Sequence, residues 1–141
     1  MLQLDMKFII PTRIVLGKNK KRSFPLNVNT FANQHHRVKH NAKMVFYDYI
    51  NTLEFKIKPY DKKVRLHYKY WSERNGLFDE ANIGGGLDKF TADALVGAGV
   101  LVDDNHRHVK HYTFEYTGVK KGHDWGRDDL KGYCEVEIIS I

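Results

Sequence analysis

The sequence has only one cysteine, Cys134, among its 141 residues. No disulfide can therefore form within the chain, and a zinc site of the CxxC type is excluded. The chain also lacks any apolar run close to the roughly 20 residues that a membrane-spanning helix needs. Its first ten residues, MLQLDMKFII, lack the basic start and apolar centre of a signal peptide. We therefore expect a soluble cytoplasmic protein.

Acidic residues are in the minority, with 17 Asp and Glu against 23 Lys and Arg, which gives a formal net charge of +6. Such a balance favours a polyanionic partner, with nucleic acid as the first candidate and an anionic membrane surface as the second. The apolar fraction of 42% and the charged fraction of 28% are ordinary for a globular protein. The length suits one hydrophobic core, so we expect a single domain over residues 1–141.

The apolar periodicity predicts an α+β fold of the mixed α/β kind. Alternation of apolar and polar residues predicts strands with one buried face, and apolar residues at three- and four-residue steps predict helices. The predicted strands cover residues 2–10, 53–57, 64–70, 107–119 and 133–141, and the predicted helices cover residues 29–50 and about 86–96. This order predicts a mixed sheet of about five strands with two main helices.

Basic residues gather in a predicted loop at residues 17–29 and on one face of the first predicted helix. They are Lys18, Lys20, Lys21, Arg22, His36, Arg37, Lys39 and Lys43. Basic side chains make many of the phosphate contacts in protein–DNA complexes, so these are candidate DNA-binding residues. An ordinary solvated helix face has a similar composition, and the sequence leaves both interpretations open.

Two adjacent aspartates, Asp103 and Asp104, follow a glycine-containing turn in the stretch at residues 81–109. Like charges repel, and the pair is tolerable if a divalent cation or a nearby lysine offsets the repulsion. An ordinary acidic turn also explains it. Upstream, three glycines at residues 84–86 precede the second predicted helix and allow an anion, such as a DNA backbone, to approach closely. They lack the GxxxxGK[ST] pattern of a nucleotide-binding loop.

The stretch at residues 83–109, and within it the segment DALVGAGVLVDDNHRHV, resembles the RusA-like Holliday junction resolvases, small endonucleases of phages and prophages. The shared features are a helix that ends in Asp-Ala-Leu, a short turn, a hydrophobic triplet and an aspartate pair that opens a strand. The resemblance is close over this stretch and loose over most of the chain. It implies a homodimer that binds four-way DNA junctions and cuts them with magnesium, in the host cytoplasm if a phage encodes the chain.

Carried over position by position, the family's metal site is only partly present. The family has the motif D-x-D-N-x-x-K at the start of the second helix, plus the second aspartate of the pair. Asp104 matches that aspartate and Lys89 matches the motif lysine, whereas the two motif aspartates fall on Ile83 and Gly85. If the helix is one turn shorter, Asp88 replaces the second motif aspartate. The chain therefore has at least one acidic ligand fewer than the family motif.

The resemblance gives candidate catalytic residues and candidate ligands for Mg²⁺, with Mn²⁺ as a possible substitute. The catalytic candidates are Asp104, Asp88 and Lys89, and the metal candidates are Asp104, Asp88 and Asp103. Magnesium prefers oxygen ligands and keeps several waters, so one or two carboxylates and a DNA phosphate can complete its shell. Lys89 would stabilise negative charge developing on the phosphate. Asp79 and Glu80 are the nearby acids available to replace the missing ligand.

Ordinary roles are also open to the residues of the second predicted helix. Asp88 suits the first turn of a helix, where the macrodipole favours a negative charge. Lys89 and Asp93 are four residues apart, which is the spacing of a surface ion pair.

The resemblance to the RusA-like resolvases therefore implies a magnesium-dependent endodeoxyribonuclease that resolves Holliday junctions or other branched DNA in recombination or replication. A two-fold dimer is the natural assembly for cutting two symmetric strands, and we expect no membrane partner. One alternative is a RusA-like protein with an impaired metal site that binds junctions without cutting them. A second alternative is an unrelated RNA-binding or structural protein.

Overall fold

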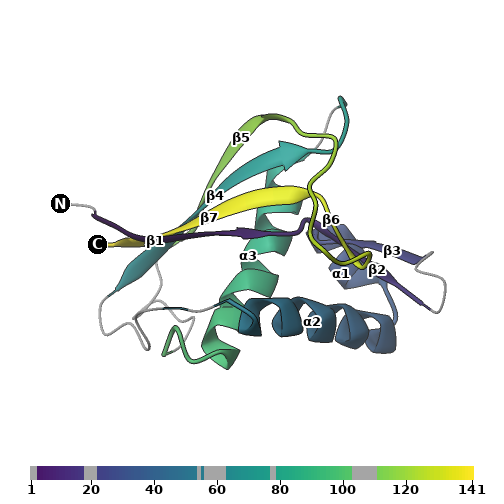
Figure 1. Ribbon diagram of the computed structural model, residues 1–141, viewed down its shortest axis with the longest axis horizontal. Helices are drawn as coiled ribbons and strands as arrows, with labels where there is room; N and C mark the ends of the chain where they lie inside the picture. The colour runs from purple at the N-terminus through teal and green to yellow at the C-terminus, as the bar shows by residue number, and fades with distance from the viewer. Residues whose placement is uncertain (1–2, 18–21, 54, 56–62, 77–78, 103–110) are drawn as a thin grey trace.

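The computed structural model describes residues 3–17, 22–53, 55, 63–76, 79–102 and 111–141 (Figure 1). Its helices are α1 (Val28–Asn33), α2 (His36–Asn51) and α3 (Glu80–Gly97). Its strands are β1 (Gln3–Ile10), β2 (Arg13–Leu16), β3 (Arg22–Pro25), β4 (Val64–Ser72), β5 (Thr113–Val119), β6 (Leu130–Lys131) and β7 (Tyr133–Ser140). The predicted α+β class is confirmed.

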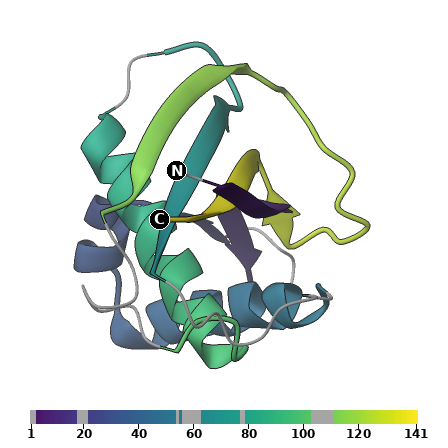
Figure 2. The same cartoon turned by 90° about the vertical axis from the view of Figure 1, so that its left-hand side faces the viewer.

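The described strands form a mixed sheet and a smaller antiparallel sheet. The mixed sheet has the order β1-β7-β4-β5, in which β7 runs antiparallel to β1 and β4, and β5 runs parallel to β4. The smaller sheet has the order β3-β2-β6. Figures 1 and 2 show α2 and α3 together on one side of the mixed sheet. The helices therefore cover one face of that sheet.

Several predicted boundaries are wrong. Strand β3 lies within the predicted loop at residues 17–29, and the predicted helix at residues 29–50 is two helices, because His35 has an extended backbone that separates α1 from α2. The predicted strand at residues 53–57 lies largely outside the described residues. The other four predicted strands correspond to β1, β4, β5 and β7 of the mixed sheet, and β2, β3 and β6 of the second sheet were not predicted as strands.

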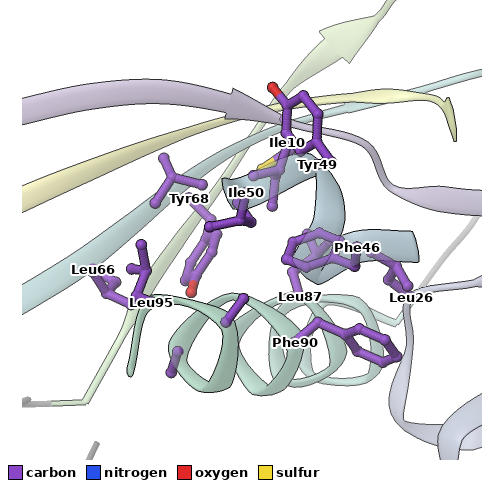
Figure 3. Close-up of a cluster of buried hydrophobic side chains, with 14 of the residues drawn as sticks. Ile10, Leu26, Phe46, Tyr49, Ile50, Leu66, Tyr68, Leu87, Phe90 and Leu95 are labelled. Carbon is purple, nitrogen blue, oxygen red and sulfur yellow. The ribbon is translucent and has the colours of Figure 1, made fainter. Parts of the chain in front are cut away.

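The core lies between the mixed sheet and the helices. Alternate residues of β4 and β7 are buried on the face that the helices cover, as two-residue periodicity requires. Figure 3 shows Leu66 and Tyr68 from β4 facing Leu87 and Leu95 of α3. The fully buried ring of Phe90 packs edge-on against three other phenylalanine rings, at centroid distances of 5.8 to 6.0 Å. This aromatic cluster joins the smaller sheet and all three described helices.

Helix α3 begins six residues earlier than the sequence predicts, so the triple glycine lies inside the helix instead of before it. Asp79 caps its start, since the carboxylate Oδ1 accepts hydrogen bonds from the backbone N–H groups of Ala81 (3.0 Å) and Asn82 (3.3 Å). A Cβ at Gly86 would overlap Asn27 Cα and lie 2.6 Å from its backbone nitrogen. A Cβ at Gly84 would lie 3.0 Å from the Tyr112 ring. The glycines therefore let α3 pack closely against neighbouring protein segments.

Tyr49 ties α2 to β1. Its hydroxyl donates a 2.6 Å hydrogen bond to the carbonyl of Ile9, and its ring lies edge-on to Trp125 at 5.4 Å. Burial raises the pKa of Tyr49 to about 12, because the surrounding protein disfavours the charged phenolate.

This raised pKa predicts that the protein loses stability between pH 10 and pH 12. In that range the unfolded chain releases the Tyr49 proton while the folded protein keeps it, so the unfolding free energy falls by about 1.4 kcal/mol per pH unit from this group. Tyr49→Phe is expected to remove that part of the slope, a difference of roughly 2 kcal/mol over the range. Urea unfolding at several pH values measures it. Identical alkaline slopes in the two proteins would contradict the prediction, and below pH 8 both should be parallel.

Candidate nucleic-acid interface

Three lysines surround the ring of Phe31 on the helical side of the molecule. The ammonium nitrogens of Lys89, Lys39 and Lys43 lie 4.7, 4.8 and 5.2 Å from the ring centroid. The ring belongs to α1, Lys39 and Lys43 belong to α2, and Lys89 belongs to α3. We call Phe31 and these three lysines the Phe31 cluster.

Local structure explains why these side chains meet. Lys39 and Lys43 are four residues apart on α2, which places them on neighbouring turns of one face. Phe31 is fixed because its ring packs edge-on against Phe90 at 6.0 Å, with an interplanar angle of 90°. The packing of α3 against α1 then brings Lys89 to the same ring.

Two side-chain hydrogen bonds hold α1 in this position. The Asn27 carbonyl Oδ1 caps the helix by accepting a 2.7 Å bond from the backbone N–H of Thr30. The Asn82 side chain of α3 accepts a 2.8 Å bond from the backbone N–H of Asn29. Close packing at Gly86 and these two caps therefore fix the helix that presents Phe31.

The Phe31 cluster concentrates positive charge. Each ammonium lies near one ring centroid, so no two of them are more than about 10 Å apart, a separation close to the Debye length at physiological salt. Among the described residues, no carboxylate forms an ion pair with any of the three lysines. The ring face attracts each cation by about 0.5–1 kcal/mol at an exposed site, which offsets part of their repulsion. An anion such as a phosphate would offset the remainder.

Lys89 lies in the Phe31 cluster, and its expected ion pair with Asp93 is not formed. Neighbouring residues on a helix point in directions about 100° apart, and Asp88 faces the sheet. The Asp88 carboxylate Oδ1 accepts a 2.8 Å hydrogen bond from the hydroxyl of Tyr68, which is fully buried. The two predicted catalytic residues of α3 thus have different surroundings.

The Asp88 carboxylate lies beside two tyrosine side chains, Tyr68 and Tyr112. Burial raises the pKa of Tyr68 well above its ordinary value, and the nearby Asp88 carboxylate raises it further. Burial also raises the pKa of Tyr112, again with a contribution from Asp88. Asp88 is half-buried in the third turn of α3, instead of in the first turn as the sequence predicted. The prediction that the helix macrodipole explains Asp88 is therefore wrong. Its carboxylate instead accepts a hydrogen bond from the Tyr68 hydroxyl, which stays protonated.

The other predicted site residues are scattered or lie outside the described residues. Arg22 is exposed at the start of β3, and His36 and Arg37 are exposed in the first turn of α2. The predicted residues outside the described ranges are Lys18, Lys20, Lys21, Asp103 and Asp104. Within the described ranges, no three His, Cys, Asp or Glu side chains gather as a metal site.

Phe31 was not among the site residues predicted from the sequence. The i, i+4 spacing of Lys39 and Lys43 was visible in the sequence, but the approach of Lys89 depends on how α3 packs.

None of the helices in the described part of the chain has the length and apolarity to cross a membrane.

Comparison with family models and with curated proteins found no match to this chain.

Proposed function

We propose that this chain is a magnesium-dependent endodeoxyribonuclease that cuts branched DNA, and that the Phe31 cluster holds phosphates of the bound strand. The observation that supports this proposal most directly is the meeting at one ring of three lysines from two helices, none of which is paired with a carboxylate of the described residues. Lysine ammonium groups bind phosphate oxygens as point charges, and clusters of them supply most of the affinity for DNA. The net charge of +6 also favours a polyanionic partner, and Arg22, His36 and Arg37 add further exposed basic side chains.

The metal would be held by carboxylates on and after α3. Asp88 offers oxygen ligands of the kind that Mg²⁺ and Mn²⁺ prefer, and it is half-buried beside Tyr68 and Tyr112. Asp104, with Asp103 beside it, supplies the further acids in this proposal, and these two lie outside the described residues. A bound Mg²⁺ polarises the scissile phosphate and lowers the pKa of an attacking water. In this arrangement Lys89 binds DNA at the Phe31 cluster and does not act next to Asp88.

A two-fold homodimer is part of the proposal, because a four-way junction presents two symmetric strands. Cleavage of both strands then requires two copies of the site in a fixed relation.

Asp104→Asn is expected to lower magnesium-dependent nicking of a synthetic four-way junction by about 100-fold, because a neutral amide replaces a charged metal ligand. Junction affinity should change by less than about threefold, since the Phe31 cluster is intact. Nicking is followed by gel electrophoresis and affinity by fluorescence anisotropy. Wild-type protein that binds junctions tightly and cuts none in magnesium or manganese would refute the nuclease assignment.

The second candidate function is junction binding without cleavage. The hydrogen bond from Tyr68 favours it, because that bond gives the Asp88 carboxylate a structural use in fixing α3 to the sheet. The same assay separates the two functions. Preference for RNA over both junction and duplex DNA would instead support an RNA-binding protein.

A further inference from the structure

A pocket of about 530 Å³ lies where the smaller sheet meets the end of β4. Its walls include Arg13 of β2, Ser23 and Pro25 of β3, Tyr70 of β4, and the loop residues Arg74 and Asn75. Pockets that bind small molecules have volumes of roughly 300–1,000 Å³, so its size suits one nucleotide. Arg13 and Ser23 hydrogen-bond to each other in one of these walls.

One wall of the pocket is held rigidly. The Arg13 guanidinium binds both carboxylate oxygens of Glu73 at 3.1 to 3.3 Å, and its Nη1 donates a 3.3 Å bond to the Ser23 hydroxyl. These contacts join β2, β3 and the segment after β4. A bidentate arginine–carboxylate pair fixes geometry as well as charge, so the wall is formed before any ligand binds.

The charges around the pocket leave one cation without a matching acid. Glu73 neutralises Arg13, while Arg74 is exposed and forms no ion pair with any carboxylate among the described residues. An arginine guanidinium presents a planar fork of donors that matches the oxygens of a phosphate. The free charge of the pocket therefore favours a phosphorylated ligand over a neutral one.

The remaining walls suit a flat heterocycle. Tyr70 and Pro25 provide an aromatic ring and an apolar surface, and Tyr70 packs beside Phe114 at a centroid distance of 5.7 Å. Asn75 can both donate and accept, which is what the hydrogen-bonding edge of a nucleobase requires. Burial raises the pKa of Tyr70 to about 12, and the Glu73 carboxylate contributes, so the Tyr70 hydroxyl stays protonated at neutral pH.

The pocket lies close to the Phe31 cluster along the chain. Pro25 of the pocket and Phe31 are six residues apart. Even if the three residues before α1 were fully extended, the Cα atoms of Pro25 and Phe31 would be no more than about 15 Å apart. At 3.4 Å per nucleotide, that is about four or five nucleotides of one strand. A strand held by the lysines can therefore reach the pocket.

We propose that the pocket binds one unstacked nucleotide of the DNA strand, with the base against Tyr70 and Pro25 and the phosphate on Arg74. Nucleotides at a branch point have fewer stacking partners than those in a duplex, so unstacking one of them costs less there. The pocket would then contribute to selection of branched over duplex DNA. This role in DNA selection rests on the proposed function, whereas binding of a nucleotide by the pocket does not.

The test uses the fluorescent nucleotide 2-aminopurine deoxyriboside 5′-monophosphate, whose emission falls when its base stacks on an aromatic ring. Wild-type protein is expected to quench it saturably, and the corresponding nucleoside without phosphate should bind at least about tenfold more weakly. Arg74→Ala should weaken nucleotide binding by a similar factor. Ser23 is exposed on a strand, where tyrosine is well tolerated. The substitution Ser23→Tyr should therefore fill the pocket and abolish quenching of the nucleotide. Lys121→Ala is the charge-matched control, because Lys121 is exposed and lies outside the pocket lining.

Each outcome has a definite meaning. Absence of saturable quenching by the wild-type protein overturns the pocket assignment even if junction DNA binds normally. Quenching by Arg74→Ala and Ser23→Tyr that equals the quenching by the wild-type protein also overturns it. Saturable, phosphate-dependent quenching that the two pocket variants lose supports the assignment, even if the protein neither binds nor cuts junctions. A loss of junction-over-duplex preference in the pocket variants, with nucleotide binding also lost, supports the role in DNA selection.

Discussion

Replacing Lys39, Lys43 and Lys89 together by alanine is expected to weaken binding to a four-way junction about 1,000-fold at physiological salt. Each lysine removed eliminates a contact between opposite charges, and a contact that contributes about 1.4 kcal/mol changes the affinity tenfold. The three ammonium groups surround one ring and have no described carboxylate partner, so their full charge is available to phosphates. Fluorescence anisotropy with a labelled junction measures the change.

The salt dependence provides an independent readout of the same triple variant. Each phosphate contact contributes about −0.9 to the slope of log affinity against log salt, so the slope should become less steep by about 2.7. A matched triple variant, Lys63→Ala, Lys121→Ala and Lys131→Ala, removes the same charge from positions outside the Phe31 cluster. If that control weakens binding as much as the cluster variant does, then diffuse net charge holds the DNA and the cluster is not a binding site.

The triple cluster variant should not be destabilised. The three lysines repel one another in the free protein, and each interacts with the ring by only about 0.5–1 kcal/mol at an exposed site. The urea midpoint is therefore expected to stay the same or to rise slightly. A large fall in the midpoint would mean that the lysines are needed for folding, and the loss of affinity would then have a different cause.

The general character of the fold could be predicted from the sequence because periodicity reports burial directly. Alternation along β1, β4 and β7 identifies strands with one face on a core, and the structure pairs these strands in one sheet. Strand β5 was also predicted within residues 107–119, although alternation does not show that it runs parallel to β4. Parallel neighbouring strands need a long crossover connection, usually with a helix. Helix α3, within residues 79–102, lies in the connection between β4 and β5.

Helix α3 shows how local propensity can mislead. Glycine disfavours helix interiors by about 1 kcal/mol per residue, so a run of three suggested a loop before the helix. The tertiary contacts of Gly84 and Gly86 reverse that preference, because a side chain at either position would meet protein atoms at 3.0 Å or less. Asp79 is the N-cap of α3, and aspartate is a preferred N-cap residue, so the helix start had a signal in the sequence that was not used.

The candidate interface was only partly predictable. Lys39 and Lys43 were identified as candidates from their spacing on a helix, whereas Lys89 was expected near Asp88 and a metal. Its side chain instead lies over Phe31, since successive helix positions diverge and Asp88 faces Tyr68. Which helix faces meet is decided by packing between segments that are far apart in the sequence, and a single sequence does not encode that in any local pattern.

Gly86→Ala is expected to destabilise the protein by about 3 kcal/mol. The added Cβ would meet three backbone atoms of Leu26 and Asn27, all closer than real Cβ contacts allow, and backbone cannot turn aside as a flexible side chain does. Overpacking of this kind usually costs about 1–3 kcal/mol, and contact with three backbone atoms places this position at the upper end. The matched control is Gly97→Ala in the same helix, where nothing lies within 4 Å of the added carbon. There alanine should raise the unfolding free energy by up to about 1 kcal/mol through helix propensity.

The same substitution connects the packing of α3 to the Phe31 cluster. Relief of the contact at Asn27 requires α3 to move away from the segment that caps α1, and Asn27 itself accepts the capping bond from Thr30. Phe31 follows Thr30, so a shift there separates Lys89 from Lys39 and Lys43. Folded Gly86→Ala protein, measured at a temperature well below its midpoint, should therefore bind junction DNA less tightly than Gly97→Ala. Equal affinity and equal stability of the two variants would show that the close approach at residue 86 neither limits the fold nor positions the cluster.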